Sequence, residues 1–303
     1  MRGSILWRSA DNRDMSAPLV LTTKGLEDYA LVDSGHGRKL ERFGKMLLDR
    51  PEEQAMWSPR LPPSTWERAD AIFSGDVDEE GAGRWKRLPG VGEEWECRHG
   101  TLRFSCRFTS FRHVGAFPEQ EAHFSFMRER LSATGGSPSL LNLFGYTGLA
   151  SLIAAEAGAE VTHIDASKKA IAWGRENQAL SKLDDKPIRW ILDDAPKFVA
   201  REVRRGRRYD GILLDPPKFG RGPKGEVWEL FQNLPEMMKL CRELLKQGGF
   251  LILTAYAIRA SFLSLHRLSE DVLGPGVESG ELALIDEGGR LLPTSLFSRW
   301  IAP

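Results

Sequence analysis

The 303-residue chain is poor in cysteine and carries no net charge. Its three cysteines, Cys97, Cys106 and Cys241, are odd in number and lack metal-ligand spacing, so the sequence predicts neither a disulfide framework nor a zinc site. Lysine and arginine together number 42, as do aspartate and glutamate, which gives a formal net charge of 0. No overall field therefore draws the protein to nucleic acid, and any such contact must be a local patch.

Long apolar runs are also missing. The most apolar stretch, residues 250–258, is far shorter than the ~20 residues that cross a bilayer, and the first residues lack the apolar core of a secretory signal. Together with the few cysteines, this pattern predicts a soluble protein of the cytoplasm that binds no membrane and no metal. No internal repeat or low-complexity tract is visible.

The chain divides into two parts by its patterning. Residues 1–20 are polar and are predicted to be flexible. Short β-rich pieces follow at 28–33, 38–49, 94–99 and 100–108. Residues 58–92 are rich in proline, glycine and charge, which is typical of loops. We therefore predict a smaller β-rich N-terminal domain over 21–118 and a larger domain over 119–303.

Strands and helices alternate in the larger domain. After a helix over 119–133, strands are predicted at 139–144, 159–164, 187–191, 209–214 and 249–255, and helices at 148–158, 167–182, 195–205, 227–246 and 259–271. This alternation predicts an α/β fold with a doubly wound, Rossmann-like sheet covered by helices on both faces. Strands near 282–286 and 296–301 complete a seven-stranded sheet with a C-terminal β-hairpin, the variant of this fold that binds S-adenosylmethionine.

A glycine-containing turn, Asn142-Leu-Phe-Gly-Tyr-Thr-Gly148, follows the first of these strands. Glycines allow positive φ angles and a close approach of ligand to backbone. Asp165 ends the next strand 17 residues after Gly148, about where Rossmann units bind a ribose diol. A dinucleotide site needs three glycines to seat a pyrophosphate, and Phe144 stands where the first would be. S-adenosylmethionine, which has no phosphate, fits better; an ordinary turn with an incidental aspartate is the alternative.

Ligands of open α/β sheets bind at the carboxyl ends of the strands. The predicted cofactor contacts at three strand ends are Asn142, Phe144, Gly145, Tyr146, Thr147 and Gly148; Asp165 and Ala166; and Asp193, Asp194 and Ala195. We expect the first group to face the methionine part and Asp165 to accept from the ribose hydroxyls. Asp194 is expected to accept from the adenine amino group, although it is also placed to be a helix N-cap.

Asp215-Pro-Pro-Lys-Phe219, after the fourth strand, is the most specific signal in the chain. Two prolines fix φ and remove two donors, which leaves acceptors beside the Asp215 carboxylate. Such acceptors suit a group bearing N–H, for instance the edge of a nucleic-acid base, and Phe219 is available for stacking. Asp215, Pro216, Pro217 and Phe219 are accordingly the predicted catalytic residues; a mere turn is the alternative.

The chain resembles the large-subunit ribosomal RNA methyltransferase family that includes the bacterial 23S rRNA cytosine-5 and guanine-7 enzymes. The segments that carry the resemblance are Asn142–Gly148, Asp193-Asp194, Asp215–Gly222 and Gly115–Gln120. The resemblance implies a class I fold, S-adenosylmethionine as cofactor and RNA as substrate. In such enzymes the segment matching Gly115–Gln120 lies over the cofactor, so Phe117 and Gln120 become candidates for the wall of the site.

Two features depart from the cytosine-5 enzymes of that family. Those enzymes carry cysteines after the fifth strand, where a thiolate attacks the ring, but this chain has Leu253-Thr-Ala-Tyr-Ala-Ile-Arg259 there. A recognisable small RNA-binding barrel is also missing from the N-terminal part. We therefore predict an S-adenosylmethionine-dependent methyltransferase acting on a nitrogen of an RNA base, with rRNA favoured. A protein or small-molecule methyltransferase and a non-catalytic cofactor- or RNA-binding protein are the alternatives.

Two groups of basic residues are candidate phosphate contacts. Arg103 and Arg107 share the polar face of a predicted strand and are the better candidates for contact with phosphates. The second group is expected on a solvated helix end, where cations suit the helix dipole. It comprises Lys197, Arg201, Arg204, Arg205, Arg207 and Arg208. The six histidines show no metal or triad spacing and are expected to be structural.

Overall fold

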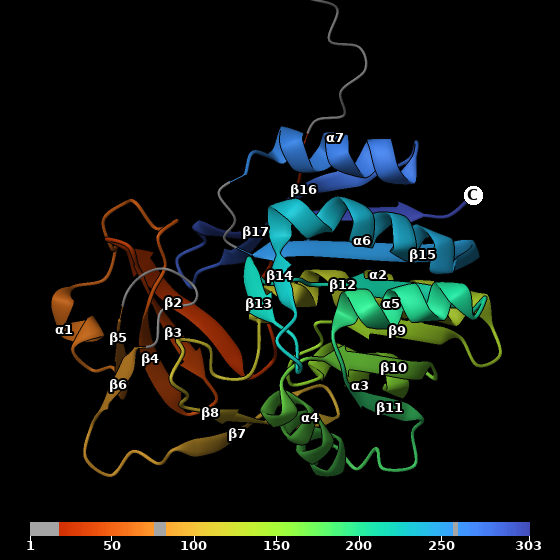
Figure 1. Ribbon diagram of the computed structural model, residues 1–303. Coiled ribbons are helices and arrows are strands. Elements are labelled where there is room, and N and C mark those ends of the chain that lie inside the picture. Colours follow the sequence, from red (N-terminus) through yellow and green to blue (C-terminus); the bar gives the residue numbers. More distant parts are fainter. Residues whose placement is uncertain (1–17, 76–82, 257–259) are drawn as a thin grey trace, which may run out of the picture.

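The computed structural model describes residues 18–75, 83–256 and 260–303, which form two main sheets and two short two-stranded ones (Figure 1). The largest sheet has the strand order β1-β16-β17-β15-β12-β9-β10-β11. Its parallel core is β9 (Ser139–Leu143), β10 (Glu160–Asp165), β11 (Ile188–Leu192), β12 (Tyr209–Leu214) and β15 (Leu245–Tyr256). Its other side is β1 (Leu19–Thr23), β16 (Glu278–Ile285) and β17 (Leu291–Ile301), with β17 antiparallel to both of its neighbours.

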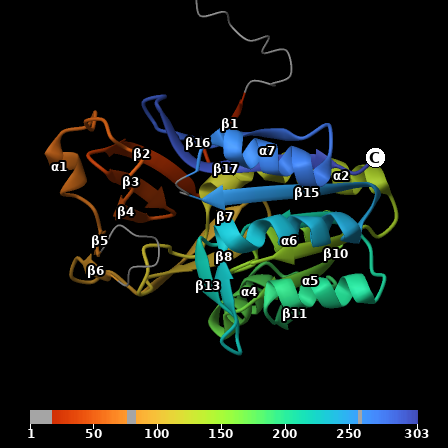
Figure 2. The same ribbon diagram turned by 45° about the horizontal axis from the view of Figure 1, so that its top comes forward.

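Helices cover both faces of this sheet (Figure 2). One layer is α2 (Glu121–Thr134), α3 (Leu149–Glu156) and α4 (Lys168–Leu180), and the other is α5 (Ala195–Arg204), α6 (Leu230–Leu244) and α7 (Phe262–Leu273). The predicted doubly wound α/β fold with a C-terminal hairpin is thus confirmed. Within the described parts of the chain, no helix is long and apolar enough to span a bilayer.

The sheet has eight strands instead of the seven predicted, because Leu19–Thr23 adds β1 in parallel to β16 at the edge. A glycine at position 280 permits this pairing, since a Cβ there would lie 1.8 Å from the carbonyl oxygen of Leu19. The partner is far away in sequence, so no local pattern indicates the strand. Its residues belong to the large sheet, which corrects their assignment to the flexible terminus and the N-terminal domain; the boundary near residue 118 stays a prediction.

A separate five-stranded sheet confirms the β-rich character of the N-terminal region. It contains β2 (Tyr29–Gly35), β3 (Arg38–Phe43), β4 (Met46–Pro51), β5 (Ala71–Ser74) and β6 (Arg84–Arg87), with the short helix α1 (Pro63–Trp66) between β4 and β5. The piece predicted over 38–49 is in fact two strands, because Gly44 takes a φ of 57° and closes a tight hairpin. The segment 58–92 holds α1, β5 and β6, which are too short to show a periodic pattern.

The hairpin of β7 (Glu94–His99) and β8 (Leu102–Arg107) lies against α4. Ser105 accepts a hydrogen bond from the Trp173 indole at 2.7 Å, and its backbone N–H donates to the Asn177 side chain at 2.9 Å. Phe43 of the N-terminal sheet, Phe104 of the hairpin and residues of α3 belong to one apolar core. The N-terminal region and the large sheet therefore pack as one continuous body.

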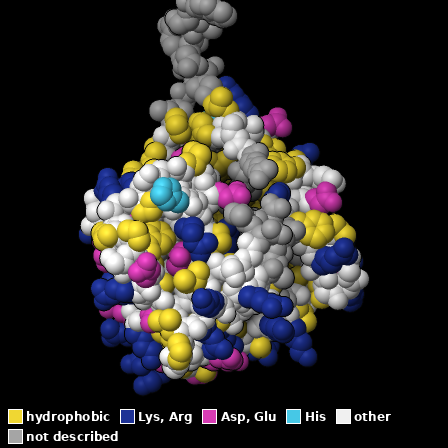
Figure 3. All heavy atoms as spheres, turned by 90° about the vertical axis from the view of Figure 1, so that its left-hand side faces the viewer, with side chains coloured by type: hydrophobic (Ala, Val, Ile, Leu, Met, Phe, Trp, Pro, Cys, Tyr) yellow, Lys and Arg dark blue, Asp and Glu magenta, His cyan; other side chains and the backbone are white. Residues whose placement is uncertain are grey.

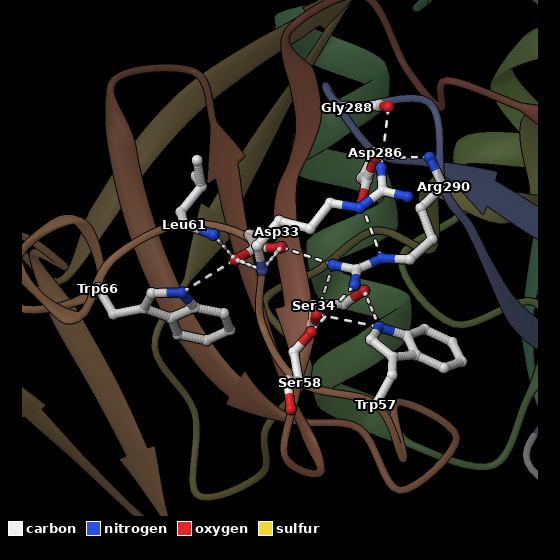
Figure 4. A network of polar contacts seen from close by, with 10 residues as sticks. Asp33, Ser34, Trp57, Ser58, Leu61, Trp66, Asp286, Gly288 and Arg290 are labelled. Carbon is white, nitrogen blue, oxygen red and sulfur yellow. Dashed lines mark hydrogen bonds and ion pairs between the residues drawn. The ribbon is translucent and has the colours of Figure 1, made fainter.

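A polar network also joins β2 to the turn between β16 and β17 (Figure 4). Arg290 donates to Asp33 Oδ1 at 2.6 Å and to Asp286 Oδ2 at 3.2 Å, and both carboxylates are buried. Asp33 also accepts from the backbone N–H of Leu61 at 2.9 Å and from the Trp66 indole at 3.2 Å. One arginine thus stabilises two buried charges contributed by opposite ends of the chain.

Two predicted helices begin differently in the structure. The helix predicted over 119–133 starts with a 3-10 turn, η1 (Pro118–Gln120), before α2. The helix predicted over 227–246 begins only at Leu230, because Val227–Glu229 forms β14 and pairs with β13 (Phe219–Arg221). Valine and tryptophan favour a strand at these positions. The sequence prediction extends the helix over them.

Candidate active site

The turn after β9 has an unusual backbone. Phe144 and Tyr146 take φ angles of 57° and 51°, a left-handed region that non-glycine residues seldom enter. Gly145 is required for another reason: a Cβ there would lie 2.3 Å from the ring of His163. Gly148, with a φ of 82°, opens α3. The glycines therefore allow close packing beneath the turn, and two aromatic residues carry most of its backbone strain.

Buried polar groups hold this turn from below. Asn142 donates to Ser151 at 2.9 Å, and the Ser151 hydroxyl lies 2.9 Å from Nδ1 of His163. Burial lowers the pKa of His163 to about 3, so its imidazole is neutral. Thr147 donates to the carbonyl of Gly115 at 2.5 Å. The Asn142 and Thr147 side chains are thus engaged inside the protein, and their contact with the cofactor stays a prediction.

Asp165 joins the turn to the end of β10. Its Oδ2 accepts from the backbone N–H of Tyr146 at 2.8 Å, and its Oδ1 accepts from that of Ser167 at 2.7 Å. Burial raises the pKa of this carboxyl, although the two backbone donors oppose the shift. Each oxygen keeps lone-pair capacity for a further donor. Asp165, beside the half-buried Ala166, is therefore both a brace for the turn and a possible acceptor for ligand hydroxyls.

Asp193 and Asp194 follow β11 and have different partners. Asp194 is the N-cap of α5, accepting from the backbone N–H of Lys197 at 3.0 Å, which confirms the N-cap interpretation. Asp193 pairs with Arg201 at 2.7 Å. Burial raises the pKa of Asp194. Ala195 is buried as the first residue of α5, and adenine binding by these residues stays a prediction.

Asp215 lies at the end of β12 and is held by a residue from η1. Gln120 donates from Nε2 to Oδ2 of Asp215 at 2.9 Å, and its Oε1 accepts from Thr254 of β15 at 3.4 Å. The structure therefore brings Gln120 and Asp215, both predicted site residues, into direct contact. Since an amide donor stabilises a carboxylate, this arrangement favours Asp215 as an acceptor.

The two prolines after Asp215 have different surroundings. Pro216 is buried and Pro217 is exposed, but the Pro217 carbonyl accepts from the indole of Trp228 at 2.7 Å. It is therefore occupied by the protein, which corrects the expectation that this acceptor points freely into the site. Phe219 begins β13 and is half-buried, with the Arg221 guanidinium 5.8 Å from its ring centroid.

An aromatic cluster faces the turn from the segment before α2. The ring of Phe117 lies 5.7 Å from Tyr146, 6.0 Å from Tyr256 and 4.8 Å from His113. Phe117 was predicted as part of the wall, whereas Tyr256 and His113 were missed. Tyr256 ends β15, so its place at the end of the fifth strand is the sequence signal that marks it; His113 has no comparable signal.

A buried ionic cluster of the N-terminal sheet supports Tyr256 from behind. The Tyr256 hydroxyl donates to Glu52 at 3.0 Å, and Glu52 pairs with Lys39 at 3.2 Å. Arg50 donates to Glu41 at 2.7 Å. Burial alone would raise the pKa of Glu41, but Arg50 and Lys39 hold it below its usual range. The N-terminal sheet therefore contributes structurally to one wall of the site.

The cysteines are placed as core residues. Cys241 lies inside α6 and is fully buried, and burial raises the pKa of its thiol. Cys97 and Cys106 lie in the β7–β8 hairpin, with 3.8 Å between their sulfur atoms, and both are buried. Among the residues that the structure describes, no group of three or more His, Cys, Asp or Glu is placed to hold a metal ion.

The first predicted basic group is paired with acids, and half of the second is. Arg103 bonds Glu96 at 2.8 Å, and Arg107 bonds Glu94 at 3.0 Å and also Glu176. In the second group Lys197, Arg201 and Arg205 have carboxylate partners. Figure 3, which faces the N-terminal sheet, shows Lys and Arg mainly on its lower part, with acids among them. The Arg103–Arg107 face is thus less free for phosphate than its sequence suggested.

The strand-end residues together fit S-adenosylmethionine. The carboxyl ends of β9, β10, β11 and β12 lie on one edge of the parallel sheet, which collects Tyr146, Asp165, Asp194 and Asp215 there. Carboxylates suit hydroxyl and amino donors, and aromatic faces such as Tyr146 and Phe117 attract a cation such as a sulfonium. When bound, this cofactor supplies an activated methyl group.

Comparisons with known proteins agree with this geometry. The pattern of the family described as S-adenosylmethionine-dependent methyltransferase matches residues 78–271. The solved S-adenosylmethionine-dependent methyltransferase from Agrobacterium tumefaciens is 50% identical, with a TM-score of 0.90 over 95% of each chain.

Two curated relatives are named as ribosomal RNA enzymes. Ribosomal RNA large subunit methyltransferase K/L of Syntrophotalea carbinolica is 30% identical over 57% of this chain and 24% of its own length. Ribosomal RNA large subunit methyltransferase I of Shewanella denitrificans is 34% identical over 38% of this chain and 29% of its own length. The chain therefore matches only about a quarter of the length of these relatives. On the match over residues 78–271, the chain belongs to the S-adenosylmethionine-dependent methyltransferase family, and S-adenosylmethionine is its cofactor.

Proposed function

We propose that this methyltransferase methylates a ring or exocyclic nitrogen of a base in RNA, with ribosomal RNA favoured. The observation that carries the proposal is the Asp215 carboxylate held by Gln120 at the end of β12. This acceptor lies on the same sheet edge as the cofactor turn, beside the buried Pro216. The names of the curated relatives support RNA as the class of substrate. With RNA as substrate, the proposed place of action is the cytoplasm.

In the proposed reaction the enzyme mainly has to position the base, because the methyl group of S-adenosylmethionine is already activated. With S-adenosylmethionine bound, its methyl group would pass to an acceptor nitrogen of the base, and the residues of the site would hold that nitrogen in position. Where the nitrogen carries a proton, that proton leaves to Asp215 directly or through water. The Gln120 amide keeps Asp215 oriented for this task, because it donates to Oδ2 of the carboxylate.

The cysteines support a nitrogen acceptor over ring carbon five of cytosine. Methylation at that carbon needs a thiolate that attacks the ring. Cys241 lies inside α6 and Cys97 and Cys106 in the β7–β8 hairpin, all three are buried, and burial raises the pKa values of Cys241 and Cys106. A buried thiol with a raised pKa is a poor nucleophile at neutral pH.

The experiment that tests this proposal is transfer of a labelled methyl group from the cofactor to fractionated RNA, protein and metabolites from cells lacking the enzyme. We expect label in RNA, on a nitrogen when the labelled nucleosides are separated, and none with Asp215→Asn. Label in protein or in a small molecule would replace RNA as the substrate. Absence of transfer to every fraction, by enzyme that binds the cofactor, would favour a non-catalytic binding protein.

A further inference from the structure

The hairpin β13–β14 rises from the sheet directly after Asp215-Pro-Pro and is firmly anchored (Figures 1 and 2). Trp228 is buried, donates to the carbonyl of Pro217 at 2.7 Å and lies 4.9 Å from the ring of Phe144 in the cofactor turn. Glu226, near its tip, pairs with Lys197 of α5 at 2.6 Å. The hairpin is therefore a fixed wall of the site, tied to both the turn and α5.

The outer surface of this hairpin combines free cations with exposed apolar side chains. Lys218, Arg221 and Lys224 are exposed, and no ion pair involves them within the described part of the chain. Phe231, in the first turn of α6 at the base of the hairpin, is 61% exposed, and Val227, which pairs with Arg221 next to the hairpin tip, is 52% exposed. Neither side chain contributes to the core, so their exposure calls for a ligand or partner.

The position of these cations separates them from the other basic groups. Helix α5 begins with Asp194 at the edge that carries the strand ends, so its far end, with Arg204, lies at the opposite edge, as do Arg207 and Arg208 just before β12. Arg103 and Arg107 are paired with acids. The hairpin cations are exposed, have no ion pair among the described residues and lie on the segment that follows Asp215, a combination that those other groups lack.

We propose that the hairpin β13–β14 and the first turn of α6 form a binding surface for single-stranded RNA that flanks the target base. Lys218, Arg221 and Lys224 contact the phosphates, and the exposed ring of Phe231 stacks on a base next to the target. Cations beside an exposed aromatic ring are the combination that single strands recognise, because each base offers a π-face and each nucleotide a negative charge. This inference rests on the proposed RNA substrate and names the element that binds it.

The phosphate contacts are tested by the salt dependence of RNA binding to the full chain, with an end-labelled single-stranded oligoribonucleotide as probe. In the variant Lys218→Ala/Arg221→Ala/Lys224→Ala the slope of log K against log salt should become less steep by about 2, at about 0.7 for each lost contact. The affinity at low salt should fall about tenfold or more. The matched control is Arg204→Ala/Arg207→Ala/Arg208→Ala, which removes as many arginine or lysine charges from the opposite edge and should leave the slope unchanged.

Stacking is tested at Phe231. Phe231→Ala should weaken RNA binding about tenfold, the effect of losing one base–aromatic contact. Phe231→Tyr should restore the affinity, whereas Phe231→Leu, which keeps apolar area without a π-face, should not. Cofactor affinity should stay unchanged in all of these variants, because the ring points away from the core.

The outcomes separate this inference from the proposed function. If the wild-type chain methylates RNA but the hairpin triple variant keeps its affinity and its salt slope, the hairpin is not the RNA surface and only this inference fails. If the wild-type chain neither binds nor methylates RNA, the proposed substrate class fails as well. Equal losses in the hairpin triple variant and its control would mean that net charge alone attracts the RNA, which also overturns the assignment.

Discussion

Gln120 donates a hydrogen bond from its side-chain amide to Asp215 at 2.9 Å, across 95 residues of sequence. The same side chain accepts from Thr254, so one glutamine links η1 to the ends of β12 and β15. Because Phe117 immediately precedes η1 and contacts Tyr146, Asp215 and the turn after β9 are positioned by a single segment. Binding and chemistry should therefore be separable by substitutions on either side of this link.

Substitution of Asp215 should remove chemistry and leave binding. Asp215→Asn keeps the size of the side chain but loses the charge that accepts a proton, so methyl transfer should fall about a hundredfold or more. Cofactor affinity, measured by calorimetry, should stay within a few-fold. A parallel loss of both would show that Asp215 holds the cofactor. Gln120→Ala, which removes one donor to the carboxylate, should have a smaller effect on the rate.

Asp165 should be the complementary case. Asp165→Ala removes an acceptor for the ligand and the brace that binds the backbone N–H of Tyr146 at 2.8 Å, so cofactor binding should weaken by about 1.5 to 3 kcal/mol. Asp165→Asn keeps one oxygen and should lose less. Calorimetry provides the measurement, and thermal unfolding without cofactor serves as the control for folding. Undiminished affinity in the alanine variant would remove Asp165 from the site.

No cysteine should be needed for turnover. The three thiols are buried, so alanine, which brings no unsatisfied hydroxyl, is the suitable replacement. A folded triple variant, Cys97→Ala/Cys106→Ala/Cys241→Ala, should retain methyl transfer within about tenfold, a change of ~1.4 kcal/mol in the barrier. An inactive variant with a native circular dichroism spectrum and normal cofactor affinity would contradict the nitrogen-acceptor mechanism, as would a covalent adduct between Cys241 and RNA containing 5-fluorocytosine.

Acid should destabilise the protein partly through His163. Its ordinary pKa is 6.5, but burial lowers the pKa in the folded protein to about 3, so the unfolded chain binds more protons between these values. The stabilisation is complete above about pH 6.5 and is lost as the pH falls, at about 1.4 kcal/mol for each pH unit. In His163→Gln, the free energy of unfolding measured by chemical denaturation should change less steeply with pH, by the contribution of one bound proton. The wild-type protein, measured in parallel, gives the reference slope.

The contact between Arg290 and Asp33 should matter for stability. Arg290→Met leaves the Asp33 and Asp286 carboxylates buried without their shared cation, so the free energy of unfolding should fall by about 3 kcal/mol or more. The matched control is Arg267→Met, which breaks an exposed pair with Glu270 on α7 and should cost less than about 1 kcal/mol. Equal effects of the two substitutions in denaturant titrations would show that the network is not a stabilising contact.

Local patterns in the sequence were enough for the fold class and for the position of the turn after β9. Strand and helix periodicity depends on neighbours within a few residues, and Gly148, Asp165 and Asp215 mark where elements begin or end. The structure has the corresponding elements at these positions. The Asp194 cap was predictable for the same reason, because an N-cap bonds its own helix. The N-terminal strands were harder, since β5 and β6 have only four residues each.

Only the tertiary structure decided which distant groups share the site. The Gln120–Asp215 bond, the Tyr256 wall and the pairing of β1 with β16 join residues far apart in sequence, and no periodicity records such contacts. It also decided that Arg107 is paired with acids while the hairpin cations stay exposed, because charge pairing depends on which elements meet in space. The sequence by itself determined the chemistry available at each strand end; the packing of the N-terminal sheet and the hairpin determined how that chemistry is assembled.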